Sequence, residues 1–198
     1  MSSVTNVAIA GVGGQGIILA SDIIAQAALS AGHDVKKNEV HGMAQRGGAV
    51  ISEIRFGRHI HSPLIPDGEV DVLLALELLE ALRQLHRLRA DGLVIANDLR
   101  LPPAVRLPSA PEYPKDVLKR LRSSADRVVV IRAARLAERA GNPRAANTVL
   151  LGALSRYLDL PLGTWHSALQ ACLRPSLVAV NLRAFELGRN RVRTKRKH

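Results

Sequence analysis

The sequence is poor in cysteine, in aromatic residues and in long apolar runs, and each shortage excludes a class of protein. Its single cysteine, Cys172, cannot form an internal disulfide, and an iron–sulfur cluster generally needs four cysteine ligands. Aromatic residues make up 3% of the chain, too few for the stacking surfaces that bind single-stranded nucleic acid. No stretch approaches the roughly 20 apolar residues that span a bilayer, and the N-terminus lacks a signal-peptide pattern. We expect a cytoplasmic protein that has no membrane partner.

Acidic residues are also scarce relative to basic ones, which gives a formal net charge of +11. Residues 189–198 carry six Lys and Arg and no acid, and setting these six aside leaves +5 for the other 188 residues. A terminal basic run is typical of a disordered tail, although contact with an acidic partner or with RNA stays open. We expect a single domain at 1–188 and a basic tail at 189–198, and we do not expect nucleic-acid binding to be the main function.

Strand patterns alternate with helix patterns over most of the chain. Strands are expected from Val7 and at 33–37, 49–57, 71–76, 92–96 and 127–131. Helices are expected at 15–31, 78–89, 115–123, 133–140, 143–157, 163–173 and 176–187, the last ended by Gly188. This order predicts an α/β fold, namely a Rossmann-like three-layer domain with a mostly parallel sheet and a helical C-terminal part.

The first strand ends in the glycine-rich stretch GVGGQG, after which a helix begins. Glycines at this position can take positive φ and let a ligand approach the backbone, and the start of the following helix offers free N–H groups to a phosphate. The candidate cofactor-binding residues are Gly11, Gly13, Gly14, Gln15 and Gly16. The same glycines could instead serve only close packing of helix and strand.

A dinucleotide site would need more than these glycines. The GxGxxG fingerprint is completed by an acid about 20 residues further on, which binds a ribose hydroxyl. Lys36 and Lys37 occupy that region, and they suit a phosphate better than a ribose diol. The pattern therefore weakens the case for NAD, although a free-standing Rossmann-like nucleotide-binding oxidoreductase or binding protein remains the alternative function.

A second polar stretch, NEVHGMAQRGG at 38–48, is predicted to be a functional loop. Glu39 and His41 could act as an acid–base pair, and Arg46 could hold an anion together with neighbouring backbone N–H groups. The full set of candidates is Glu39, His41, Gln45, Arg46, Gly47 and Gly48. The loop could instead only buttress the glycine turn or form a subunit interface. No metal site is predicted.

Four stretches in order resemble one known family: GVGGQGI at 11–17, EVHGMAQRGG at 39–48, SPLIPDGEVDVLLALE at 62–77 and GNPRAANTVLLGAL at 141–154. The chain is similar, from Val7 to about Gly188, to the γ-type subunit or domain of 2-oxoacid:ferredoxin oxidoreductases, and in particular to the β subunit of the indolepyruvate:ferredoxin enzymes. Any one motif would be weak evidence, but several spaced motifs in the same order are specific.

This resemblance implies oxidative decarboxylation of a 2-oxoacid, here an aryl pyruvate such as indolepyruvate. The family uses thiamine diphosphate, passes electrons through iron–sulfur clusters to ferredoxin and transfers the acyl group to coenzyme A. This chain has neither the GDG signature of a thiamine diphosphate site nor the cysteines of a cluster. Thiamine diphosphate with Mg²⁺ and the [4Fe–4S] clusters are therefore expected on a larger partner subunit, and no cofactor on this chain alone.

The resemblance also implies roles for the two glycine-containing stretches. The loop at 39–48 is expected to line the active-site cleft, where Gln45 and Arg46 would bind the substrate carboxylate or a coenzyme A phosphate. Glu39 and His41 would then assist positioning or proton transfer. The turn at 11–16 could approach coenzyme A or only shape the interface. The basic tail is not recognised as part of the family and could contact an acidic partner surface or ferredoxin.

Overall fold

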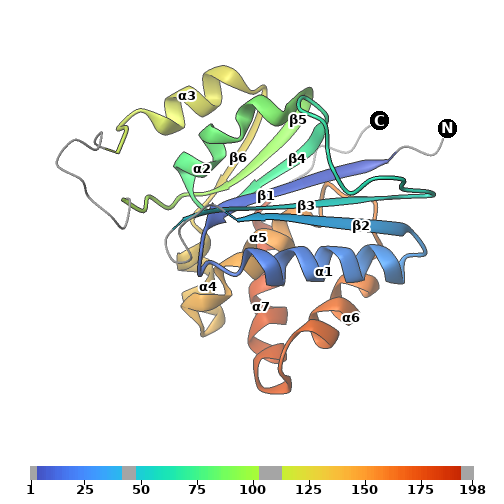
Figure 1. The fold of residues 1–198 in the computed structure, drawn as a ribbon. Coiled ribbons are helices and arrows are strands. Elements are labelled where there is room, and N and C mark those ends of the chain that lie inside the picture. Colours follow the sequence, from blue (N-terminus) through green and yellow to red (C-terminus); the bar gives the residue numbers. More distant parts are fainter. Residues whose placement is uncertain (1–3, 42–47, 103–112, 193–198) are drawn as a thin grey trace, which may run out of the picture.

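The computed structural model describes residues 4–41, 48–102 and 113–192, and its centre is one six-stranded sheet (Figure 1). The strands lie in the order β2-β3-β1-β4-β5-β6, which leaves β2 and β6 at the two edges. Their bounds are β1 Thr5–Val12, β2 Asp34–His41, β3 Ala49–Gly57, β4 Val70–Ala75, β5 Leu88–Asn97 and β6 Arg127–Ile131.

The sheet is mostly parallel, as predicted, with one exception. Strands β1, β4, β5 and β6 pair in parallel, whereas β3 lies antiparallel between β1 and β2. The connection from β2 to β3 is too short for a parallel crossover, so the two strands form a hairpin. Strand β2 also continues to His41, four residues beyond its predicted end at Lys37. The polar residues Asn38 and Glu39, expected in a loop, are therefore paired with β3.

Seven α-helices among the described residues cover both faces of the sheet (Figure 1). Helices α2 and α3 cover one face, and α1 with α4 to α7 lies on the other, which confirms the three-layer fold and the helical C-terminal part. Their bounds are α1 Ile17–Ser30, α2 Leu78–Arg83, α3 Val117–Ser124, α4 Ala133–Ala140, α5 Ala146–Leu154, α6 Leu162–Cys172 and α7 Pro175–Arg191, with 3-10 turns at Leu85–Arg87 and Pro143–Ala145. No helix in the described part of the chain is long and apolar enough to cross a bilayer.

Helices α5 and α7 cross at two glycines with almost no space between their backbones. A β-carbon added at Gly188 would lie 1.8 Å from the Val149 carbonyl oxygen, and one at Gly152 would lie 1.9 Å from the Phe185 oxygen. Gly188 therefore does not end the last helix, as its sequence position suggested, but lies within α7 as a contact point. The helix continues to Arg191, into the stretch predicted as tail, while residues 193–198 lie outside the described residues.

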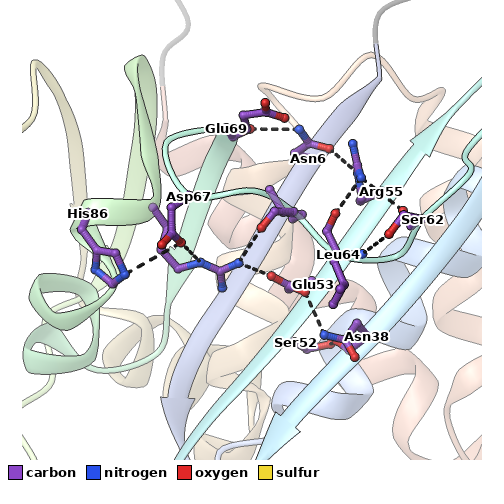
Figure 2. Close-up of polar contacts among 12 residues, drawn as sticks. Asn6, Asn38, Ser52, Glu53, Arg55, Ser62, Leu64, Asp67, Glu69 and His86 are labelled. Atoms are coloured by element: carbon purple, nitrogen blue, oxygen red, sulfur yellow. Dashed lines mark hydrogen bonds and ion pairs between the residues drawn. The ribbon is translucent and has the colours of Figure 1, made fainter.

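Part of the sheet face on the α2 side is covered by a connecting segment, residues 62–69, rather than by a helix. Figure 2 shows the polar network that holds it. The Arg55 guanidinium donates to the Leu64 carbonyl at 2.6 Å, and Arg87 donates to the Ile65 carbonyl at 3.2 Å. Arg87 also forms a buried ion pair with Glu53 of β3. Two arginines thus fix this segment over β1 and β3.

Candidate functional site

A cleft of about 510 Å³ opens beside the glycine turn, at the carboxyl ends of β1, β4 and β5. Its lining comes from the turn at 14–16, from Leu76 and Asn97 just after or at the end of their strands, from residues 142–147 before α5, and from the start of α7. A volume of this size is typical of small-molecule sites, and the carboxyl edge of parallel strands is where α/β proteins bind ligands. The cleft is therefore the candidate functional site.

Side-chain amides build the floor of this cleft. The Gln15 Oε1 atom accepts from the Val12 N–H at 2.7 Å, and its Nε2 donates to the Leu76 carbonyl at 3.2 Å. Asn97 donates to the same Leu76 carbonyl at 3.3 Å. Gln15, predicted to contact a cofactor, thus holds the glycine turn against the end of β4. Its role toward a ligand stays a prediction.

One wall of the cleft is joined to the glycine turn by Asn147, from the start of α5. Its side-chain amide donates to the Gly16 carbonyl at 3.2 Å. Gly16 has a φ of +78°, and a β-carbon there would lie 2.5 Å from the Asn147 Nδ2 atom. The left-handed backbone favours glycine at this position, and a side chain there would displace the Asn147 amide. Asn147 therefore sets the width of the cleft at the turn.

The cleft favours an anion. Helix α1 begins at its rim and has neither a side-chain cap nor an acidic residue in its first turn. Uncapped helix starts present free N–H groups and the positive end of the helix dipole. Arg144, exposed on the wall of the cleft, adds a full positive charge. A phosphate or carboxylate would be stabilised at this position.

The described end of the second predicted loop meets the glycine turn through a backbone hydrogen bond. The Gly13 N–H donates to the Gly48 carbonyl at 3.0 Å. Residues 42–47, which include the candidates Gln45, Arg46 and Gly47, lie outside the described residues, as does the His41 side chain. Their predicted roles are neither supported nor contradicted by the geometry. The contact does place the end of this loop beside the turn.

Glu39 forms an ion pair within the described residues, and its predicted pairing with His41 stays a prediction. It lies on β2, and its carboxylate is 2.8 Å from the Lys37 ammonium, which also bonds to Asp22 of α1. Burial opposes the charged form of Lys37, but the Asp22 and Glu39 carboxylates raise its pKa above the usual value. Lys37 is therefore a structural cation that anchors β2 to α1.

The strand arrangement also argues against a dinucleotide site. In the fingerprint fold, the second strand lies next to the first, so that its end reaches the ligand held by the glycine turn. Here β3 lies between β1 and β2, so β2 is about 10 Å away from β1. Neither Lys36 nor Lys37 occupies the ribose-binding position of that fold.

The described residues contain no group of three or more His, Cys, Asp or Glu side chains that could hold a metal ion. His59 and His61 are exposed and lie outside the strands. Cys172 is half-buried, and burial raises the pKa of its thiol, so it is a poor nucleophile at neutral pH.

The residues that sequence reasoning missed are Asn97, Asn147 and Arg144. Asn97 ends a strand, and Arg144 and Asn147 lie where a helix begins, positions at which polar residues often serve only to cap the element. Asn142 is indeed a cap, because its side chain accepts from the Arg144 N–H. The signal that could have identified Asn147 is its place in the GNPRAAN stretch, one of the motifs that carry the family resemblance.

Known proteins resemble nearly the whole of this chain. The model of the pyruvate ferredoxin/flavodoxin oxidoreductase family matches residues 6–191. The chain is 41% identical to indolepyruvate oxidoreductase subunit IorB of Archaeoglobus fulgidus, covering 93% of this chain and 94% of that protein. It is 39% identical to the subunit of the same name from Thermococcus kodakarensis, with 92% and 93% covered.

A solved structure shares the fold. Pyruvate oxidoreductase subunit PORC of Thermotoga maritima superposes with a TM-score of 0.72 at 22% identity, over 94% of this chain and 96% of that one. At this identity the likeness shows the fold, whereas the match of nearly the whole sequence to the family model shows the relationship. The chain belongs to the pyruvate ferredoxin/flavodoxin oxidoreductase family.

Proposed function

We propose that this chain is the small subunit of an indolepyruvate:ferredoxin oxidoreductase, which oxidatively decarboxylates an aryl pyruvate to its acyl-coenzyme A. The observation that carries this proposal is the identity of 39–41% to indolepyruvate oxidoreductase subunits over more than nine-tenths of both chains. The substrate could be another 2-oxoacid, but these relatives favour indolepyruvate. Electrons released by the reaction pass to ferredoxin.

The cofactors belong to a larger partner subunit in this proposal. Thiamine diphosphate supplies the electron sink for decarboxylation, and iron–sulfur clusters carry the electrons away. One cysteine and the absence of a GDG motif leave this sequence without the ligands for either group. The chain contributes binding and positioning groups to a cleft completed by the partner.

The 510 Å³ cleft is proposed to receive an anionic part of coenzyme A or of the 2-oxoacid. The uncapped start of α1 and the charge of Arg144 provide the positive potential, while Gly14 and Gly16 let the ligand approach the backbone. Asn147 and Gln15 keep this arrangement fixed before the ligand arrives. Pre-organised groups of this kind lose little free energy to reorganisation on binding.

Co-expression with the expected larger subunit, which should carry a GDG motif and clustered cysteines, tests the function. The two chains should co-purify and reduce ferredoxin only when indolepyruvate and coenzyme A are both present. Pyruvate and 2-oxoglutarate, supplied in place of indolepyruvate, test the substrate class. A chain that forms no complex and binds NAD on its own with useful affinity would contradict the proposal and favour the free-standing nucleotide-binding alternative.

Arg144→Gln is expected to raise the KM for coenzyme A about tenfold or more, because a charged hydrogen bond to a phosphate contributes about 1.5–3 kcal/mol. The complex should still assemble, because Arg144 is exposed on the cleft wall. Steady-state kinetics of the co-purified complex provide the measurement. Arg58→Gln, an exposed arginine outside the cleft, is the matched control and should leave KM unchanged.

Arg46→Ala is expected to lower coupled turnover at least about tenfold without dissolving the complex, because it removes the guanidinium proposed to bind a substrate or coenzyme A anion. Turnover of the co-purified complex, together with its elution volume, measures both effects. Unchanged turnover would remove Arg46 from the active site and leave the loop at 39–48 as an interface element.

A further inference from the structure

Five arginines surround a second cavity, of about 560 Å³, at the open edge of the sheet. The cavity lies beside β6, which pairs only with β5 among the described residues. Helix α3 contributes one arginine, the start and the outer side of α4 contribute three, and the end of α7 contributes the last. They are Arg122, Arg132, Arg135, Arg139 and Arg191.

In the part of the chain that the structure describes, most of these positive charges have no acidic partner. Asp98 is the one acid among the described residues lining the cavity, and it is 3.2 Å from Arg132. Within residues 4–41, 48–102 and 113–192, no ion pair or side-chain hydrogen bond is formed by the guanidinium groups of Arg122, Arg135, Arg139 and Arg191. By comparison, the exposed Arg120 is paired with Asp116 at 2.8 Å.

We infer that this arginine pocket is a second anion-binding site that takes the oligophosphate group of a phosphorylated small molecule. It is separate from the 510 Å³ cleft, and it stands or falls independently of the proposed function. Like charges gathered in one concavity repel one another, and a bound polyanion offsets that repulsion. The planar guanidinium donates two parallel hydrogen bonds to a phosphoryl group, which makes arginine the suitable residue for this ligand.

The shape of the site favours a small ligand over an acidic protein. A concave volume of 560 Å³ is within the range of small-molecule pockets, whereas protein partners usually meet flatter surfaces. Leu118, Val130 and Leu136 also line it, so part of the cavity is apolar and strengthens the electrostatic attraction. Arginines whose only role was to keep other strands from pairing with the edge of β6 would not need to surround one cavity.

Inorganic tripolyphosphate is the probe, and isothermal titration of the full 198-residue chain is the measurement. The double variant Arg135→Gln/Arg139→Gln should bind the probe at least about tenfold more weakly than the wild type. The matched control, Arg58→Gln/Arg174→Gln, removes the same charge at two exposed positions outside the pocket and keeps the basic tail. The affinity of this control for tripolyphosphate should stay within about twofold of the wild-type value, because it loses only a long-range attraction that salt screens.

Two further experiments identify the chemical class of the ligand. Arg135→Lys/Arg139→Lys keeps the charge but not the bidentate geometry, and an intermediate loss of affinity supports phosphoryl recognition. Equal losses in the pocket variant and the control, or no binding of tripolyphosphate, would overturn the inference. So would polyglutamate that binds more tightly than tripolyphosphate and depends on the same arginines, since that result assigns the pocket to an acidic protein. Circular dichroism confirms that each variant is folded.

Discussion

Replacing Gly188 with alanine is expected to lower the free energy of unfolding by about 3 kcal/mol or more, the upper end of the range for overpacked cores. The new β-carbon would lie 1.8 Å from the Val149 carbonyl oxygen, and this neighbour is backbone, which cannot change rotamer. Helices α5 and α7 would have to separate along a fully buried interface that includes Phe185. Alanine's better helix propensity, about 1 kcal/mol, offsets only part of this loss.

Gly163→Ala is the matched control, since Gly163 also lies in a helix but has no atom near the position of an added β-carbon. It should leave stability unchanged or raise it slightly. Urea unfolding of both variants gives the comparison. Equal stabilities would show that the α5–α7 crossing can widen without cost, and the close packing described above would then be wrong.

Arg87→Leu is expected to destabilise the fold by about 3–5 kcal/mol, because it leaves the buried Glu53 carboxylate without its cation. The side chain of Glu53 is only 4% exposed and that of Arg87 12% exposed, so water cannot replace the lost partner. Arg87 also donates to the Ile65 carbonyl, so the segment at 62–69 loses an anchor (Figure 2). Thermal and urea unfolding measure the loss.

Two comparisons isolate the buried charge as the cause. Arg120→Leu removes an exposed ion pair with Asp116 and should change stability by about 0–1 kcal/mol. Adding Glu53→Gln to Arg87→Leu should recover part of the lost stability, since the uncompensated charge disappears while the Asn38 side chain keeps a hydrogen-bond acceptor. A double variant less stable than Arg87→Leu would contradict this explanation.

The alternation of apolar strands and helices was enough to predict the layers of the fold, because buried parallel strands and amphipathic helices leave strong local patterns. The antiparallel direction of β3 was missed. The direction of a strand depends on which strands it pairs with, and the local sequence does not identify those partners. Strand β2 was predicted too short because Asn38 and Glu39 are polar, yet both pair at a sheet edge where polar side chains are tolerated. Gly188 was misread because a contact glycine and a helix-ending glycine look alike in sequence.

The candidate site was predictable in part. The glycine turn follows from a local motif, whereas its wall depends on Asn147, 131 residues away from Gly16 along the chain. No local pattern specifies such a contact, and the amide of Asn147 resembles an ordinary helix cap. The arginine pocket was hidden for the same reason, because its members come from α3, from the start and side of α4, and from the end of α7. The composition shows an excess of positive charge, but it does not show that five arginines surround one cavity.

The hydrogen bond from Gly13 to Gly48 has a consequence for how this family can diverge. The chain is held at His41 by pairing with Val50 and at Gly48 by the glycine turn, so the connection between them starts and ends at fixed points. Doubling the length of a loop with fixed ends costs only about 0.6 kcal/mol of closure entropy. New residues can therefore be inserted or exchanged there with little loss of folding free energy. The hairpin of β2 and β3 therefore offers a position at which the connecting residues can change while the sheet stays the same.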